Sequence, residues 1–274
     1  MTEGIIKVLK ANFHTHSTFC DGISTPRESV ERAIKLGFTT LGFSGHVDIE
    51  PVMDTEAYKK EIRAIQEEYK DEIEILCGGE LDNMYHEKHP QGYDYIIGST
   101  HHLKILPDRF LAVDSSEEDL QFLCDDFFNG DYYKLIRYYY ELVSRTHDET
   151  NCTFIGHFDL VTKFNSKMHF VDEDDKRYYF PAMEAMEYLV KSGMPYFEIN
   201  TRQVSKGRIY PSKRLLSYLH ELGGEILINS DAHDARDLNK GFEQAVDLAK
   251  SCGFDHTNYL SMKSEKLKFV SVEL

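Results

Sequence analysis

Residues 11–16 of the chain read Ala-Asn-Phe-His-Thr-His, so an apolar run that begins near Ile5 ends on a His-x-His pair. A matching stretch lies near the other end of the chain, where residues 225–228 are followed by Asn-Ser-Asp-Ala-His and so by Asp231 and His233. Residues two apart in a β-strand point to the same side. Each stretch therefore predicts a strand whose carboxyl end directs two metal-binding side chains into one space.

Further strand-like runs lie between these two stretches, and helix-like segments separate them. Four of the runs end on a residue that can bind a metal, namely His46, Glu80, His101 and His157. Strands alternating with helices predict a parallel sheet with helices outside it. Polar residues at the same end of every strand favour a closed barrel, whereas an open doubly wound sheet, the alternative, concentrates its site at one crevice. We expect seven principal strands, over residues 5–13, 39–43, 74–77, 93–97, 153–155, 195–199 and 225–228, and less regular β-like material over 259–272.

The helices are expected between these strands. Thr25-Pro26-Arg27-Glu28 is a capping box with proline at the first helical position, and the helix that it opens should end near Gly37. The other expected helices cover residues 54–69, 117–146 with a break at Asn129-Gly130, 177–191, 212–222 and 238–251.

Length and composition predict one soluble domain over residues 1–274. The chain has 41% hydrophobic residues, and it lacks internal repeats, a run of about 18 apolar residues and a secretory signal. Its five cysteines form no Cys-x-x-Cys pair, which predicts free thiols and a cytoplasmic location. The net charge of −16 repels phosphates of nucleic acids and anionic membranes, so a small molecule is the expected partner.

The remaining histidines are expected to be ordinary surface or core residues, because none of them closes an apolar strand. His102 should point away from His101 if the strand continues past it. The others in this class are His86, His89, His147, His169, His220 and His256.

Taken together, these motifs resemble the polymerase-and-histidinol-phosphatase (PHP) superfamily, and within it the histidinol-phosphate phosphatases. The resemblance spans residues 13 to about 253. It implies a distorted seven-stranded (β/α)7 barrel, similar to a TIM barrel, with up to three divalent metal ions at the carboxyl ends of the strands. The motifs that carry it are His14-Thr15-His16, Ser44-Gly45-His46, Gly79-Glu80, Gly98-Ser99-Thr100-His101-His102, Gly156-His157-Phe158-Asp159-Leu160, Glu198-Ile199-Asn200-Thr201 and Asn229-Ser230-Asp231-Ala232-His233.

The resemblance also implies which residues hold the ions. A first ion would be held by His14, His16, Glu80 and Asp231, and Glu80 would bridge to a second ion held by His101 and His157. A third would lie between Asp21, His46 and His233, although some relatives have histidine near the position of Asp21. Histidine and carboxylate ligands without thiolate suit Zn²⁺, Mn²⁺ or Fe²⁺.

Such a centre predicts hydrolysis of a phosphomonoester by a metal-bridging hydroxide. Glu80, Asp231 and His233 are the expected catalytic residues, and the Asp231–His233 pair or a metal-bound water can protonate the leaving alkoxide. Arg202, Arg208 and Lys163 are candidates for binding phosphate, but they can equally be solvated loop cations. Aromatic residues over 110–140 can wall a pocket for an imidazole, although packing of an amphipathic helix explains most of them better.

The resemblance to histidinol-phosphate phosphatases implies that the substrate is L-histidinol phosphate, a precursor in histidine biosynthesis. Two alternatives stay open at this point. One is a PHP phosphoesterase that acts on a nucleotide or a sugar phosphate, and the other is a metal-binding module without catalysis.

Overall fold

Seven parallel strands form the centre of the molecule in a computed structural model that describes residues 11–47, 53–84, 91–264 and 266–274. Each strand is hydrogen-bonded to the next in one continuous sheet. Their order around the sheet is β1 (Ala11–Asn12), β2 (Thr40–Val47), β3 (Glu74–Asp82), β4 (Tyr95–Ser99), β7 (Phe154–Ile155), β8 (Tyr196–Asn200) and β9 (Glu225–Asn229). The part of the first predicted strand before residue 11 lies outside the described residues.

The sheet closes between its first and last strands. A parallel bridge joins Thr15 to Ala232, with the amide of His16 donating to the carbonyl of Ala232 at 2.8 Å and the amide of Ala232 donating to the carbonyl of His14 at 3.1 Å. This closure confirms the predicted seven-stranded barrel, and the open-sheet alternative is wrong.

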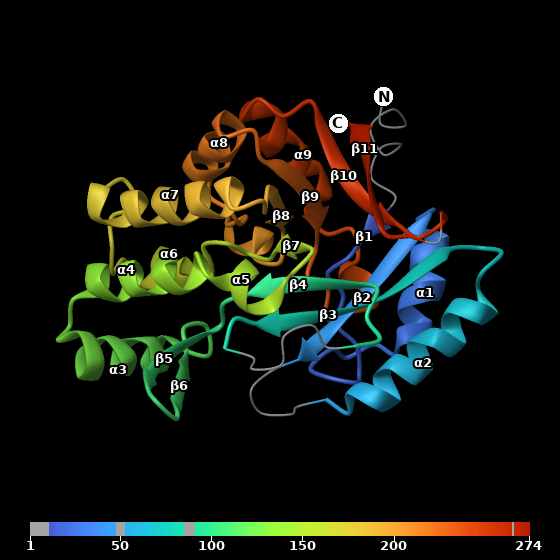
Figure 1. Cartoon of the computed structure of the whole chain (residues 1–274), viewed down its shortest axis with the longest axis horizontal. Coiled ribbons are helices and arrows are strands. Elements are labelled where there is room, and N and C mark those ends of the chain that lie inside the picture. Colours follow the sequence, from blue (N-terminus) through green and yellow to red (C-terminus); the bar gives the residue numbers. More distant parts are fainter. Residues whose placement is uncertain (1–10, 48–52, 85–90, 265) are drawn as a thin grey trace.

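Helices surround the barrel, with α1 and α2 beside β2 and β3, and α7 and α8 on the far side (Figure 1). The capping box at Thr25 is present, and Asn129 ends a helix in the left-handed conformation at φ 55°, where the break was predicted. The last helix begins four residues later than predicted because Ala235–Asp237 form a short 3-10 turn and Gly241 has φ +75°. The α-helices are α1 (Pro26–Lys35), α2 (Thr55–Glu68), α3 (Glu117–Phe128), α4 (Tyr132–Val143), α5 (Thr146–Thr150), α6 (Asn165–Met168), α7 (Lys176–Lys191), α8 (Lys213–Glu221) and α9 (Phe242–Ser251).

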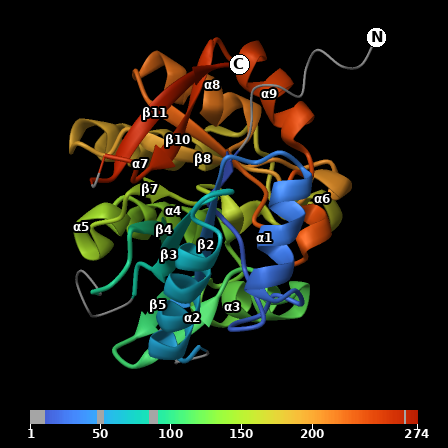
Figure 2. The same ribbon diagram turned by 90° about the vertical axis from the view of Figure 1, so that its right-hand side faces the viewer.

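Two antiparallel hairpins lie at opposite ends of the molecule (Figure 2). The hairpin of β10 (His256–Ser261) and β11 (Lys268–Glu273) accounts for the β-like material expected near the end of the chain. The hairpin of β5 (His102–Leu106) and β6 (Arg109–Ala112) was not expected from the sequence. It lies at the carboxyl ends of the barrel strands, where the predicted site residues also lie.

The barrel interior is packed around Tyr95. Its hydroxyl donates to the carbonyls of Phe13 and Phe43, at 2.6 and 2.9 Å. A Cβ on Gly42 would come 2.4 Å from that hydroxyl, and a Cβ on Gly78 would come 2.3 Å from the ring. Glycine at those two positions therefore makes room for the tyrosine. Leu260 of β10 and a stacked Tyr196–Phe269 pair cover the amino-terminal end of this core.

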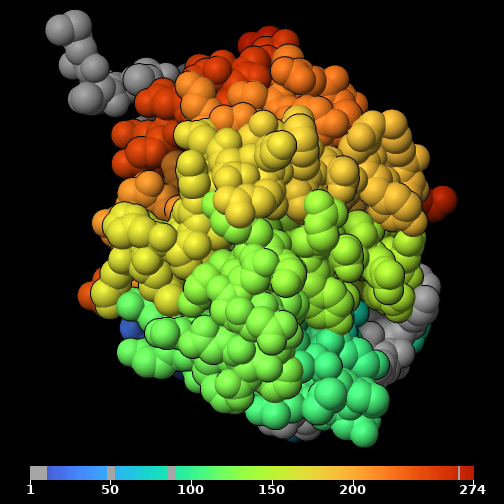
Figure 3. Space-filling model, turned by 90° about the vertical axis from the view of Figure 1, so that its left-hand side faces the viewer, coloured from blue at the N-terminus to red at the C-terminus, as the bar shows by residue number. Residues whose placement is uncertain are grey.

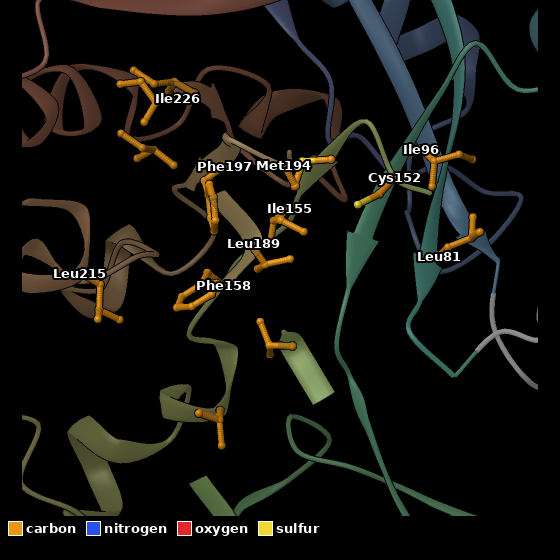
Figure 4. Packing of buried hydrophobic residues seen from close by; sticks show 14 of the residues in the cluster. Leu81, Ile96, Cys152, Ile155, Phe158, Leu189, Met194, Phe197, Leu215 and Ile226 are labelled. Carbon is orange, nitrogen blue, oxygen red and sulfur yellow. The ribbon is translucent and has the colours of Figure 1, made fainter. Parts of the chain in front are cut away.

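A larger core lies between the strands and the helices, and Figure 4 shows part of it, including Phe158, Phe197 and Leu215. Tyr139 and Tyr140 of α4 are buried in this layer, which confirms core packing as the role of these two aromatic residues. Figure 3 shows the outer face of the helices that cover this side, residues 117–143 in green and 176–191 in yellow. Among the described helices, none has the length and apolar character needed to cross a membrane.

Candidate metal centre

All nine side chains predicted as metal ligands lie together at the carboxyl ends of the barrel strands. Their ligand atoms form four overlapping groups, and within each group the atoms lie within 4.8 Å of one another. The groups are His14, His16 and Asp231; His14, Glu80 and His157; His46, Glu80 and His101; and His16, Asp21, His46 and His233.

The first group contains buried polar atoms that have no hydrogen-bond partner. His14 Nε2 lies 3.3 Å from Glu80 Oε2 and 3.7 Å from Asp231 Oδ1. His16 Nε2 lies 3.5 and 3.3 Å from the same two oxygens. Leaving such atoms unpaired in a protein interior costs about 1–3 kcal/mol each. Two imidazole nitrogens and two carboxylate oxygens that face one another fit a divalent cation placed between them.

Glu80 is the centre of the whole cluster. It is 1% exposed, and its two oxygens lie between 2.9 and 3.5 Å from nitrogens of five histidines: His14, His16, His46, His101 and His157. Burial alone would raise the pKa of Glu80, but the charges of His14, His101 and His46 outweigh it and hold the pKa well below its usual value. An ionised carboxylate in this place fits the predicted bridging ligand.

Asp21 brings the fourth group together at the more exposed side of the cluster. Its Oδ2 lies 2.9 Å from His233 Nε2 and 3.6 Å from His46 Nε2, and its Oδ1 lies 3.5 Å from His16 Nδ1. Burial and the nearby charges of His46 and His233 lower the pKa of His16 to about 3. His16 is thus a neutral imidazole, which is the form that binds metals.

Backbone conformation at the end of β9 also serves the site. Asp231 has φ +50°, a left-handed conformation that costs energy for a residue other than glycine or asparagine. Its Oδ2 accepts a hydrogen bond from Asn200 Nδ2 at 3.2 Å, while Oδ1 faces His14 and His16. The strained turn therefore aims one carboxylate oxygen into the cluster.

Two buried carboxylates behind the cluster were not predicted from the sequence. Glu198 accepts a hydrogen bond from His14 Nδ1 at 2.8 Å, which leaves Nε2 of that ring free for a ligand role. Asp82 Oδ2 accepts from the amides of His101 and His102, at 2.7 and 3.2 Å, and lies 3.4 Å from His101 Nδ1. Carboxylates in this position orient metal-binding histidines and raise their basicity.

The signal that could have found these carboxylates was their position in apolar strands. Glu198 interrupts the strand 196–200 and Asp82 ends the strand 74–82, and neither residue is more than 2% exposed. An acidic residue buried in a strand needs a specific partner. His102 also lines the cavity, since β4 ends at Ser99 and the chain turns before β5 begins.

Seven of the nine cluster side chains, all except His14 and His16, line a cavity of about 700 Å³, and the three predicted phosphate-binding cations differ in their positions around it. Arg202 lines the cavity, and its guanidinium has no hydrogen bond or ion pair among residues 11–47, 53–84, 91–264 and 266–274. Lys163 also lines it, but its ammonium donates to Asp114 Oδ2 at 3.0 Å and to the Asp114 carbonyl at 2.7 Å. Arg208 is not among the lining residues, and its guanidinium binds Glu173 and Thr162.

The other histidines do not join the cluster. His147, His169, His220 and His256 lie outside all four groups, as expected. His86 and His89 lie outside the described residues.

The model of the PHP domain family matches residues 12–202, which is more than half of the chain. The chain belongs to the PHP domain family. The match ends before β9, Asp231 and His233. The structure shows that this last strand and the two site residues after it belong to the same barrel. The shared fold extends beyond the matched region because β9 completes the barrel.

Similar proteins cover nearly the whole chain. A probable histidinol-phosphatase of Schizosaccharomyces pombe is 27% identical over 88% of this chain and 86% of that protein. The histidinol-phosphatase of Lactococcus lactis is 26% identical over 94% of this chain and 97% of that protein. A crystal structure of histidinol phosphate phosphatase from L. lactis, complexed with Zn, L-histidinol and phosphate, matches with a TM-score of 0.71 and 22% identity over 94% of this chain and 98% of that chain. A putative histidinol phosphatase from Listeria monocytogenes has the same TM-score at 21% identity, covering 86% of this chain and 99% of that one.

Proposed function

We propose that this PHP domain hydrolyses L-histidinol phosphate to L-histidinol and inorganic phosphate. The observation that carries the proposal is the set of facing, unpaired ligand atoms of His14, His16, Glu80 and Asp231, of which Glu80 and Asp231 line an open cavity. The choice of L-histidinol phosphate as the substrate rests on relatives of similar length that are named histidinol-phosphatase. We further propose that residues 1–274 form one domain and that the enzyme acts in the cytoplasm, where its five free cysteines stay reduced.

The nine side chains fit up to three divalent ions, and we propose Zn²⁺, Mn²⁺ or Fe²⁺. When bound, these ions would supply positive charge for the phosphoryl oxygens. They would also lower the pKa of a water molecule, so that it attacks phosphorus as hydroxide. Glu80, ionised and placed between five histidines, holds the cluster together.

The remaining steps use residues of the cavity wall. Arg202 is positioned to donate to a phosphoryl oxygen, because its guanidinium lines the cavity without another partner in the described part of the chain. The attacking water releases one proton to solvent, its oxygen bonds to phosphorus, the ester P–O bond breaks, and the leaving alkoxide takes up one proton. The Asp231–His233 pair, with His233 Nδ1 3.4 Å from Asp231 Oδ1, is our candidate for delivering that proton.

Phosphate release tests the proposal. The purified protein, with its metal content measured, should prefer L-histidinol phosphate over a panel of nucleotides and sugar phosphates. Glu80→Gln should lower kcat by at least a hundredfold and reduce the bound metal. Glu74→Gln is a matched control, since Glu74 begins the same strand and accepts bonds from Ser261 at the opposite end of the barrel. Preference for a nucleotide, or equal activity of wild type and Glu80→Gln, would overturn the proposal.

A further inference from the structure

We propose that Asp114 binds the positively charged amine of the substrate, and that Lys163 holds Asp114 in place rather than binding phosphate. This inference rests on the proposed function, because L-histidinol phosphate carries an ammonium group on the second carbon from its ester oxygen. The substrate thus presents a phosphate dianion and, close to it, a cation.

The ammonium group of the substrate needs a carboxylate in this cavity whose oxygens are not all bound to other groups. Five carboxylates line the cavity, and three of them, Asp21, Glu80 and Asp231, belong to the metal centre. Both oxygens of Asp234 are already engaged, because its Oδ1 accepts from the amide of Arg236 at 2.9 Å and its Oδ2 accepts from the guanidinium of the same residue.

Asp114 is the fifth carboxylate, and one of its two oxygens is open. Lys163 binds Oδ2, whereas Oδ1 has no hydrogen-bond partner within the described ranges. The side chain is 23% exposed, so this oxygen can be reached from the cavity that it lines. Among the described lining carboxylates outside the metal centre, Asp114 is therefore the one with an oxygen that carries no hydrogen bond.

The position of Asp114 next to the metal centre favours the amine over the more distant imidazole. The amide of Val113 donates to the carbonyl of His101 at 2.8 Å, so the residue before Asp114 is fixed to a side of the metal cluster. The β5–β6 hairpin brings the chain to this point directly after His101. A carboxylate here lies beside the metal centre, where we expect the phosphate to bind, and the short spacing between phosphate and amine in the substrate requires such a position.

The two bonds from Lys163 explain how Asp114 keeps its place. The ammonium donates to both the side chain and the main-chain carbonyl of Asp114, which restrains the carboxylate and the backbone together. With two of its three donors engaged on Asp114, Lys163 acts as a positioning residue.

Asp114→Asn tests the inference with two substrates that differ in one group, L-histidinol phosphate and its deamino analogue, 3-(imidazol-4-yl)propyl phosphate. Asparagine keeps an oxygen for Lys163, so the wall should stay folded, and a thermal melt checks this. A charge-assisted hydrogen bond is worth about 1.5–3 kcal/mol, so kcat/KM on histidinol phosphate should fall roughly 10- to 100-fold. The value for the deamino analogue should change less than about threefold, and calorimetry should show weaker binding of L-histidinol. Asp126→Asn, an exposed change of the same charge on α3, should alter neither substrate.

Three other results would overturn the inference. Equal losses on both substrates would mean that Asp114 has a structural role only, while the proposed function would stand. Equal losses on both substrates in Lys163→Gln would assign that lysine to phosphate instead of to Asp114. No turnover of histidinol phosphate by the wild-type enzyme would remove both the inference and the proposed function.

Discussion

Glu198→Gln should weaken metal binding without touching any atom that faces the ions. Glu198 is 0% exposed and accepts four hydrogen bonds. Its Oε1 accepts from His14 Nδ1 at 2.8 Å and from Asn229 Nδ2 at 3.1 Å. Its Oε2 accepts from the amide of His157 at 2.9 Å and from Asn200 Nδ2 at 2.9 Å. One carboxylate therefore supports two predicted ligands, His14 after β1 and His157 after β7.

The stability lost in Glu198→Gln follows from the number of hydrogen-bond donors around this side chain. A glutamine offers one acceptor oxygen, so two of the four buried donors around Glu198 face an NH2 group instead. Each buried donor without an acceptor costs about 1–3 kcal/mol, so the free energy of unfolding should fall by roughly 2–6 kcal/mol. Loss of a carboxylate behind a metal-binding histidine typically lowers metal affinity about 10- to 100-fold.

Urea unfolding and competition for Zn²⁺ against a chelator measure these two effects separately. Glu225→Gln is the matched control, because Glu225 lies at the opposite end of β9 and accepts from His256 and Asn258 at 2.9 and 2.8 Å. That variant should lose some stability and keep the metal affinity of the wild type. A Glu198→Gln protein that binds Zn²⁺ as tightly as Glu225→Gln does would refute the role assigned to Glu198.

Three further predictions concern packing, pH and metal removal. Gly156→Ala would place a Cβ 2.6 Å from Ser99 Oγ, which donates a hydrogen bond to Glu80 Oε1. We expect the free energy of unfolding in urea to fall by about 1–3 kcal/mol and phosphatase activity to be lost. Unchanged activity would contradict this. Hydrogen bonds with Asp255 and Glu225 raise the pKa of His256 above 6.5, so its stabilisation is complete below that pH and is lost as pH rises through the folded-state pKa. His256→Gln should remove this pH dependence, which is less than about 1 kcal/mol for so exposed a group, as urea titrations at pH 6 and 9 can show. Adding Zn²⁺ or Mn²⁺ to chelator-treated protein should raise its melting temperature, and an unchanged melt would argue against a structural contribution of the ions.

The strands and their terminal residues could be predicted because both follow from local patterns. Short apolar runs that end in His46, Glu80 or His157 specify a strand and the side chain at its end without any knowledge of distant contacts. Parallel pairing then brings these ends to one rim. The β5–β6 hairpin was missed because residues 102–112 have no apolar alternation strong enough to separate a hairpin from a loop.

The roles of the loop cations could not be predicted, because they depend on partners far away in the sequence. Arg208 pairs with Glu173, 35 residues away, and Lys163 pairs with Asp114, 49 residues away. Arg202 has a similar sequence context but no such partner in the described part of the chain. A cation looks the same in a sequence whether it is committed to a carboxylate or open to a substrate.

Closure of the barrel and assembly of the site are a single structural event in this protein. The bridge between Thr15 and Ala232 joins the middle residues of the two pairs that first indicated a metal site. Because side chains two apart share a side, this one bridge brings His14 and His16 opposite Asp231 and His233. Buried ligand atoms beside the bridge, His16 Nε2 and Asp231 Oδ1 among them, have no hydrogen-bond partner, and an ion between those atoms would remove the energetic cost of leaving them unpaired. Metal binding should therefore stabilise the seam between β1 and β9 more than any other part of the barrel, and hydrogen exchange of the Ala232 amide, with and without Zn²⁺, is the direct measure of that coupling.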